Sequence, residues 1–283
     1  VVLWVLPSCG DCEYCRSGRP YLCQARRETR GRMMDGTRRL HRDGDPIDHF
    51  YAQSSFASMA VVPERQVVPV PDDVPFEIGA LLGCGVTTGL GAVSNIADVD
   101  GGESVAVFGC GGVGAGAVLA ADAVSAGTII AVDLDSDTLE TMAEIGATHT
   151  VDAGDADPVA EIEALTDGVD YAFECIGTPQ TVQQAIASLA PGGTAAITGT
   201  SSTPPAEIDL GRFTTGISVV GNIVGFTQPR VDIPRYAAMY RNGDLDLDAI
   251  LTRRYGLDEL DEAFAALAAG EVIRSVVRFD EGA

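Results

Sequence analysis

A glycine-rich turn between a buried strand and a helix constrains the fold more than any other feature of this chain. The apolar run Ser104–Phe108 (SVAVF) leads into Gly-Cys-Gly-Gly-Val-Gly, and a helix of small residues is expected over Val113–Ala126. Such a turn lets the backbone approach a pyrophosphate closely, with the N–H groups of the helix N-terminus directed at it. The chain around it must therefore fold as a β–α–β unit.

Residues 1–70 are expected to form short strands and loops, with strands at VVLWVLP (1–7) and at the alternating FASMAVV (56–62). From about residue 85 onward, apolar runs alternate with segments typical of helices. Strands are expected at TIIAVD (128–133), THTV (148–151), VDYAFE (169–174), GTAAIT (193–198) and SVVGNIV (218–224). Helices are expected at 136–146, 158–166, 179–190, 233–242 and 257–269, and a final strand at SVVRF (275–279). Alternation of this kind predicts an α/β fold, with a doubly wound parallel sheet covered on both faces.

The turn has the features of a dinucleotide site. Its pattern G-x-G-x-x-G is answered by Asp133, which lies nineteen residues after the last glycine at the end of the second strand. A carboxylate at that point accepts from the adenosine ribose and repels a 2′-phosphate, which favours NAD over NADP. A glycine-rich turn with no ligand is the alternative. The residues assigned to the dinucleotide are Gly109, Gly111, Gly112, Val113, Gly114 and Asp133.

The pyrophosphate also needs a positive charge, and the surrounding sequence is acidic. No basic residue lies between Arg65 and Arg212. Arg274, in the sequence VIRSVV near the end of the chain, is the best candidate. The alternative is that Arg274 is only an exposed residue at the end of a strand.

Four cysteines near the start of the chain have the spacing of a metal site. The sequence Cys9-x2-Cys12-x2-Cys15-x7-Cys23 supplies four thiols within fifteen residues. Thiolates with two-residue gaps can surround one tetrahedral zinc, and a closed four-sulfur site of this type is structural rather than catalytic. Paired disulfides suit small secreted domains, and an iron–sulfur cluster of the ferredoxin type favours a different last gap. Both remain alternatives to zinc.

The composition excludes some classes of partner. The 283 residues carry a net charge of −23 with a pI of about 4.2, and all 18 basic residues are Arg. Such a surface repels nucleic acid and anionic lipid, and no apolar run suits a membrane span. We therefore expect a cytoplasmic protein without nucleic-acid or membrane partners. The absence of Lys and the acidity favour a halophilic source over an ordinary acidic protein.

Together these motifs resemble the zinc-dependent alcohol dehydrogenases of the medium-chain dehydrogenase/reductase family. The resemblance covers essentially the whole chain, and stretches such as LGCGVTTGLGAV and FTQPRVDIPR are most similar to its class III branch. The first residue is Val1 and lies in an apolar run, so we expect an N-terminally truncated chain. The motifs that carry the resemblance are the cysteine spacing, LLGCGVTTG (81–89), VFGCGGVG, AVDLD, DYAFECIG (170–177) and IRSVV.

The family fold implies three parts. Residues 1–84 would form a partial GroES-like, β-rich catalytic domain with a structural zinc lobe, and residues 85–224 the NAD-binding Rossmann domain. Residues 225–283 would return to the catalytic domain. The catalytic domain is thus interrupted by the doubly wound sheet and is incomplete here. The resemblance also implies a homodimer or homotetramer.

The resemblance further implies roles for single residues. Cys84 corresponds to one ligand of the catalytic zinc, whose two other protein ligands lie upstream of the cysteine lobe in the family; without the resemblance, Cys84 reads equally as a small buried residue. Thr88 corresponds to the threonine that packs on the nicotinamide. The other matching positions are Thr198, Ile223 and Val224 at the nicotinamide end, Arg274 at the pyrophosphate and Arg27 as an anion-recognising residue.

The function implied for the full-length protein is NAD-dependent oxidation of a primary alcohol, or of a formaldehyde–thiol adduct, by zinc-assisted hydride transfer. Its small-molecule substrate would be an alcohol or aldehyde. The truncated chain, which lacks two of the three catalytic zinc ligands, is expected to be inactive by itself. One alternative is a polyol or amino-alcohol dehydrogenase of the same superfamily. The other is a non-catalytic fragment that binds NAD and zinc.

The halophile hypothesis predicts how salt affects stability. Because molar salt shortens the screening length to about 3 Å, it should quiet the repulsion among the excess carboxylates. We expect the melting temperature to rise as KCl increases from dilute to molar, measured by calorimetry. A parallel series in sucrose controls for general exclusion from the protein surface. A flat or falling melting temperature in KCl would contradict the hypothesis.

Overall fold

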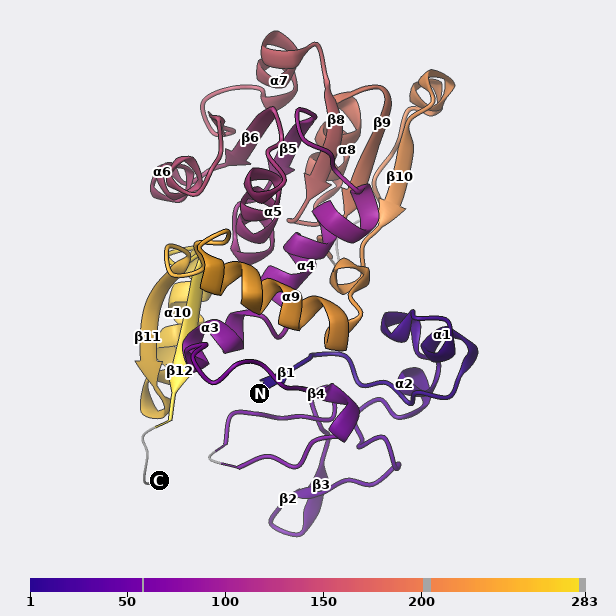
Figure 1. Ribbon diagram of the computed structural model, residues 1–283, viewed down its shortest axis with the longest axis vertical. Coiled ribbons are helices and arrows are strands. Elements are labelled where there is room, and N and C mark those ends of the chain that lie inside the picture. Colours follow the sequence, from indigo (N-terminus) through magenta and orange to yellow (C-terminus); the bar gives the residue numbers. More distant parts are fainter. Residues whose placement is uncertain (58, 201–204, 280–283) are drawn as a thin grey trace.

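The computed structural model describes residues 1–57, 59–200 and 205–279, and a six-stranded parallel sheet forms its upper half in Figure 1. The strand order is β10-β9-β8-β5-β6-β7, so the chain leaves β5 in one direction and then returns to continue on its other side. The strands are β5 (Ser104–Phe108), β6 (Thr128–Asp133), β7 (His149–Asp152), β8 (Val169–Glu174), β9 (Leu189–Ile197) and β10 (Ser218–Gly221). The predicted doubly wound α/β fold is confirmed.

Both faces of this sheet are buried, as the sequence pattern predicts. Successive residues of β5 alternate between two separate cores, with Val105 and Val107 in one and Ala106 and Phe108 in the other. Side chains of a strand point to opposite faces in turn, so an uninterrupted apolar run supplies two cores at once. This explains why β5 has no polar residue after Ser104.

The helices beside the sheet begin where local signals favour a start. Asp135 accepts a hydrogen bond from the backbone N–H of Thr138, and Asp157 accepts one from Val159. Thr178 and Thr181 satisfy each other's backbone N–H groups in a reciprocal cap. These caps satisfy donors that the first turn leaves free. The helices are α5 (Gly112–Ala123), α6 (Ser136–Glu144), α7 (Pro158–Thr166) and α8 (Pro179–Ala187).

Both chain ends and the strands outside the large sheet lie below that sheet in Figure 1. Strands β1 (Val2–Leu3) and β4 (Val67–Val68) pair antiparallel, as do β2 (Leu40–Arg42) and β3 (Asp45–Ile47), whereas β11 (Leu251–Gly256) and β12 (Arg274–Arg278) pair parallel. In the described ranges no helix is long and apolar enough to cross a membrane. The other helices are α1 (Glu13–Arg16), α2 (Ala25–Glu28), α3 (Phe76–Leu81), α4 (Gly85–Gly91), α9 (Pro229–Asn242) and α10 (Leu260–Ala269). Short helical turns are η1 (Pro20–Leu22), η2 (Glu64–Gln66), η3 (Ala92–Ala97, π-helical), η4 (Leu210–Thr215), η5 (Val224–Phe226) and η6 (Leu257–Glu259).

Several predicted strands are absent or shorter than the sequence indicated. The alternating stretch FASMAVV (56–62) forms no strand in its described residues, where Met59 and Val61 are exposed and pair with no other strand. Alternation predicts a strand only when another strand supplies the ladder of hydrogen bonds. Only Val2–Leu3 of VVLWVLP is a strand, and β10 ends at Gly221 instead of continuing through residue 224.

Helices α4 and α5 cross at unusually close range because glycines line their contact. A Cβ atom on Gly89 would overlap the carbonyl oxygen of Val113, and one on Gly116 would lie 2.7 Å from the carbonyl oxygen of Val86. Only residues without side chains permit two backbones to approach this closely. The crossing brings the start of α4, which follows Cys84, beside the start of α5, which follows the glycine-rich turn.

Candidate functional site

The glycine-rich turn lies at the carboxyl end of β5, where the sheet order reverses. Gly109 has φ +87°, which favours glycine, and a Cβ on Gly114 would overlap the carbonyl oxygen of Gly109. Gly111 precedes α5, and an added Cβ there would meet no atom within 4 Å. A switch point of this kind, with a helix N-terminus opening onto it, is where doubly wound sheets bind nucleotides.

Asp133 ends the neighbouring strand β6 and fixes the shape of the turn. Its carboxylate accepts from the backbone N–H of Cys110 at 2.6 Å and from that of Leu134 at 2.7 Å. The side chain is half-buried. The same carboxylate that was predicted to meet a ribose therefore also holds the turn against β6.

Arg274 begins β12 and extends from the last part of the chain into the space between two helix starts. A Cβ on Gly85, at the start of α4, or on Gly112, at the start of α5, would overlap the Arg274 side chain. Burial lowers the pKa of Arg274, and the neighbouring Cys84 opposes that shift. None of the ion pairs between described residues includes Arg274. A half-buried cation beside two helix N-termini is suited to an anion.

Residues predicted at the nicotinamide end come together around Asn222, which sequence reasoning missed. The Asn222 side-chain amide donates to Thr198 Oγ1 at 2.8 Å and lies 3.5 Å from the Thr88 carbonyl oxygen. Thr88 Oγ1 in turn donates to the Cys84 carbonyl oxygen at 2.8 Å, and Ile223 directly follows Asn222. No local pattern singles out an Asn at the end of a strand, because its partners are distant in the sequence.

A second missed residue is Glu174, at the carboxyl end of β8. Its Oε1 accepts from the backbone N–H groups of Ile176 and Gly177 and from Thr181 Oγ1, while Oε2 is buried with no partner among the described residues. The carboxylate thereby holds the loop whose Ile176 packs on Gly109. A single carboxylate in the apolar run VDYAFE is the signal that could have identified it.

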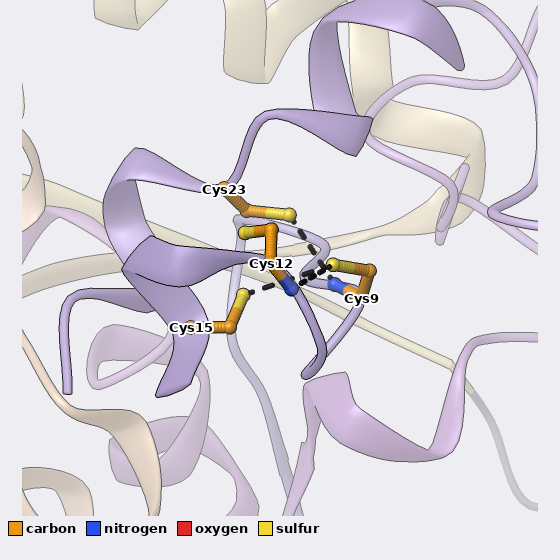
Figure 2. A group of neighbouring side chains, drawn as sticks. All are labelled: Cys9, Cys12, Cys15 and Cys23. Atoms are coloured by element: carbon orange, nitrogen blue, oxygen red, sulfur yellow. Dashed lines mark hydrogen bonds between the residues drawn. The ribbon is translucent and has the colours of Figure 1, made fainter. Parts of the chain in front are cut away.

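The four cysteines of the lobe converge on one point, as Figure 2 shows. Their sulfurs all lie within 4.8 Å of one another, and the Sγ atoms of Cys9 and Cys15 are 4.0 Å apart. A tetrahedral zinc with Zn–S bonds of about 2.3 Å requires sulfurs about 3.8 Å apart, so this set fits the ion. Among the described residues it is the one group of three or more candidate metal ligands within such a distance.

Backbone donors surround these sulfurs. The N–H of Cys9 donates to Cys23 Sγ at 3.3 Å, and hydrogen bonds from the backbone of Cys15 and Gln24 lower the pKa of Cys12 to about 6. Burial raises the pKa of Cys15 to about 12. Because a metal must displace the protons of buried thiols, its affinity for the lobe should weaken as the pH falls.

Cys84 lies apart from the lobe, at the start of α4. It borders a cavity of about 440 Å³ that Arg274 also lines. Burial by surrounding atoms raises the pKa of the Cys84 thiol even though the residue as a whole reaches solvent. A catalytic zinc takes three protein ligands, and the described residues do not assemble such a set at Cys84. The residues present therefore do not fit a complete catalytic metal site.

A second cavity, of about 600 Å³, is basic although the chain is strongly acidic. His49 lies in its wall, and the backbone N–H of Arg39 donates to His49 Nε2 at 3.1 Å. The ring proton therefore belongs on Nδ1, which is buried without a partner among the described residues. The cavity thus places His49 beside several guanidinium groups. Its arginines are Arg26, Arg27, Arg30 and Arg32.

The fold and these sites define a class of protein in which a cysteine-rich metal lobe is joined to a doubly wound nucleotide-binding sheet. A family model described as zinc-binding dehydrogenase matches residues 112–240. The chain is 38% identical to S-(hydroxymethyl)glutathione dehydrogenase of Escherichia coli O1:K1, over 96% of this chain and 75% of that protein.

Two solved structures are also similar over 99% of this chain and 77% of theirs. One is an alcohol dehydrogenase zinc-binding domain protein from Burkholderia ambifaria, with 36% identity and a TM-score of 0.94. The other is benzyl alcohol dehydrogenase from Acinetobacter calcoaceticus, with 33% identity and a TM-score of 0.90. The chain belongs to the family of zinc-dependent alcohol dehydrogenases, oxidoreductases that use zinc and a nicotinamide dinucleotide.

The geometry of the lobe predicts its metal content. We expect close to one zinc per chain by atomic absorption, retained at neutral pH and released as acid protonates the thiolates. Cys23→Ser should lose most of this zinc because it removes the buried ligand, whereas Cys175→Ser, outside the lobe, should keep it. A Cys23→Ser protein with a full equivalent of zinc would contradict the site. Two tightly held zinc ions in the native chain would contradict the incomplete ligand set at Cys84.

Proposed function

We propose that this protein oxidises a primary alcohol with NAD, and that a formaldehyde–thiol adduct is its specific form of substrate. The observation that carries the dinucleotide part is the convergence of the glycine-rich turn, Asp133 and Arg274 at the switch point of the sheet. Each part comes from a different stretch of the chain. The turn suits the pyrophosphate, Asp133 suits the ribose, and Arg274 supplies a positive charge to balance the pyrophosphate.

The residues around the glycine-rich turn would bind and orient the cofactor. Gly112 and the start of α5 would face the pyrophosphate, and Arg274 would neutralise it from the other side. Asp133 would accept from the ribose diol, which disfavours a 2′-phosphate. Thr88, Thr198 and the backbone of Ile223 would border the nicotinamide, which accepts the hydride when bound.

Two metal roles follow from the cysteines. Cys9, Cys12, Cys15 and Cys23 would hold the structural zinc. Cys84 is proposed as one ligand of the catalytic zinc, since its thiol opens on the cavity that Arg274 shares. We derive no catalytic step through that metal, because the described residues do not supply its remaining ligands.

The division into residues 1–84, 85–224 and 225–283 is likewise our proposal. All six strands of the large sheet lie between residues 104 and 221, and β10 ends just before the second boundary. The β11–β12 pair and α10 follow it in the chain. The class III-like assignment, the halophilic source and assembly as a homodimer or homotetramer stay predictions.

The basic cavity supports an anionic substrate. Arg27 and His49 share its wall, and hydrogen bonds from a charged donor such as a guanidinium are stronger than neutral ones. The segment after His49 connects it to the space beside Cys84, because Tyr51 and Ala52 line the basic cavity whereas Ser55 lines the Cys84 cavity. A thiol adduct with a carboxylate, such as one of glutathione, would match both ends of this path.

The cofactor proposal predicts the effect of changing Asp133. Asp133→Ala should weaken NAD binding and relax discrimination against NADP by about 1–3 kcal/mol, because buried polar partners lose their acceptor. The measurement is kcat/KM, or Kd in the absence of turnover, for both dinucleotides. Asp137→Ala, an exposed acid in the first turn of α6, is the matched control. An unchanged NAD-to-NADP ratio in Asp133→Ala would count against its role.

The substrate proposal predicts a selective loss at Arg27. Arg27→Gln should lower kcat/KM for S-hydroxymethylglutathione roughly 10- to 100-fold, as expected for a lost charged hydrogen bond, and leave benzyl alcohol nearly unchanged. Arg42→Gln, exposed on β2, serves as the control.

Other results of these assays would favour a different function. Equal losses for both substrates would refute recognition by Arg27, and turnover of polyols or amino alcohols instead would favour the related dehydrogenases. NADH binding without turnover of any alcohol would favour the non-catalytic protein.

A further inference from the structure

The cysteine lobe contacts a strained turn that also contacts the residues proposed to border the nicotinamide. Three successive residues of this turn have left-handed backbone conformations: Val224 (φ +49°), Gly225 (φ +63°) and Phe226 (φ +50°). Gly225 adopts such angles freely, but a β-branched Val and a bulky Phe do not. A conformation of this kind persists only where its surroundings hold it.

The lobe provides one of the groups that hold it. The ring of Tyr21, which lies between Cys15 and Cys23, stacks on the ring of Phe226 with centroids 4.8 Å apart and planes 2° from parallel. Tyr21 is buried, so the stack is protected from solvent. The lobe also approaches the residue at the start of α9, because a Cβ on Gly18 would lie 3.5 Å from the Gln228 side chain.

The other side of the turn contacts Asn222 and helix α4. Asn222 Oδ1 accepts from the Gly225 N–H at 2.7 Å, while its amide group donates to Thr198 Oγ1 at 2.8 Å. Asn95 Nδ2 donates to the Gly225 carbonyl oxygen at 2.9 Å, and a Cβ on Gly91 would overlap that same oxygen. The turn is thus packed directly on α4, the helix that carries Thr88.

We propose that Tyr21 is a positioning residue for the dinucleotide site, acting through this turn. The stacked ring holds Phe226 in its left-handed conformation, the turn then presents the Gly225 N–H to Asn222, and Asn222 orients Thr198 and the adjoining Ile223. An ordered lobe therefore favours dinucleotide binding, and by linkage a bound dinucleotide favours the ordered lobe. The role of Tyr21 at this site rests on the proposed function, whereas the holding of the turn does not.

The first test removes the ring and then relieves the strain. Tyr21→Leu should raise the Kd for NADH, measured by fluorescence titration of the full chain, by about three- to tenfold, in the range of an aromatic pair. Tyr21→Phe keeps the stack and should bind as the native protein does. Phe226→Gly also removes the stack but should keep close to the native Kd, because glycine accepts the left-handed conformation without support.

The second test follows the turn itself and needs no ligand. Hydrogen exchange measured by mass spectrometry over residues 222–228 should be faster in Tyr21→Leu than in the native chain or Tyr21→Phe. Phe226→Leu removes the stack from the other side without changing the lobe, so it serves if Tyr21→Leu loses its zinc or fails to fold. Zinc content is measured for every variant.

The outcomes are distinct. Native exchange at 222–228 after loss of the stack in Tyr21→Leu or Phe226→Leu overturns the proposal, as does a Kd in Phe226→Gly that is weakened as much as in Tyr21→Leu. A native chain that binds no NADH counts against the proposed function and removes the role at that site, while the exchange experiment still decides whether Tyr21 holds the turn.

Discussion

The close crossing of α4 and α5 is the contact on which the candidate site depends. Glycines on both helices remove the side chains that would otherwise separate them, so that backbone meets backbone at Gly89 and Gly116. The start of α4 carries Cys84 and Thr88, and the start of α5 carries the turn that suits a pyrophosphate. A wider crossing would move the thiol and the nucleotide turn apart, because a helix displaces everything attached to its end. The alignment of the two halves of the site thus rests on the absence of side chains.

The basic residues are distributed unevenly along the chain. The cofactor-binding segment between Arg65 and Arg212 has no basic residue, although its proposed ligand is an anion. The compensating charge comes from Arg274, after that segment has ended, together with partial charges at two helix starts. A half-buried guanidinium with no carboxylate partner among the described residues interacts strongly with an anion, because no ion pair between those residues must first be broken. Acidity elsewhere on the surface leaves this local preference intact.

The parts of the fold that follow from contiguous sequence were predictable. Strand β5, the turn after it and Asp133 come within thirty residues, approximately the span of one β–α–β unit, so spacing alone brings them together. Helix α4 was not predicted, since glycine and threonine are poor helix formers and the helix forms where burial compensates for that propensity. The roles of Asn222 and Glu174 were not predicted, because they depend on neighbours that come together only in the folded chain. The stretch FASMAVV misled for a related reason, since its alternation lacks a partner strand.

The position of Arg274 has a consequence for the order in which the protein is made. A chain emerging from the ribosome presents the glycine-rich turn, β6 and Asp133 well before it presents residue 274 of 283. The large sheet can be complete at Gly221, yet the cation between α4 and α5 is then still missing. A dinucleotide site in that state has the glycine-rich turn and Asp133 but lacks the positive charge of Arg274. If Arg274 supplies that charge, binding of the cofactor gains its full strength only after β12 has joined β11.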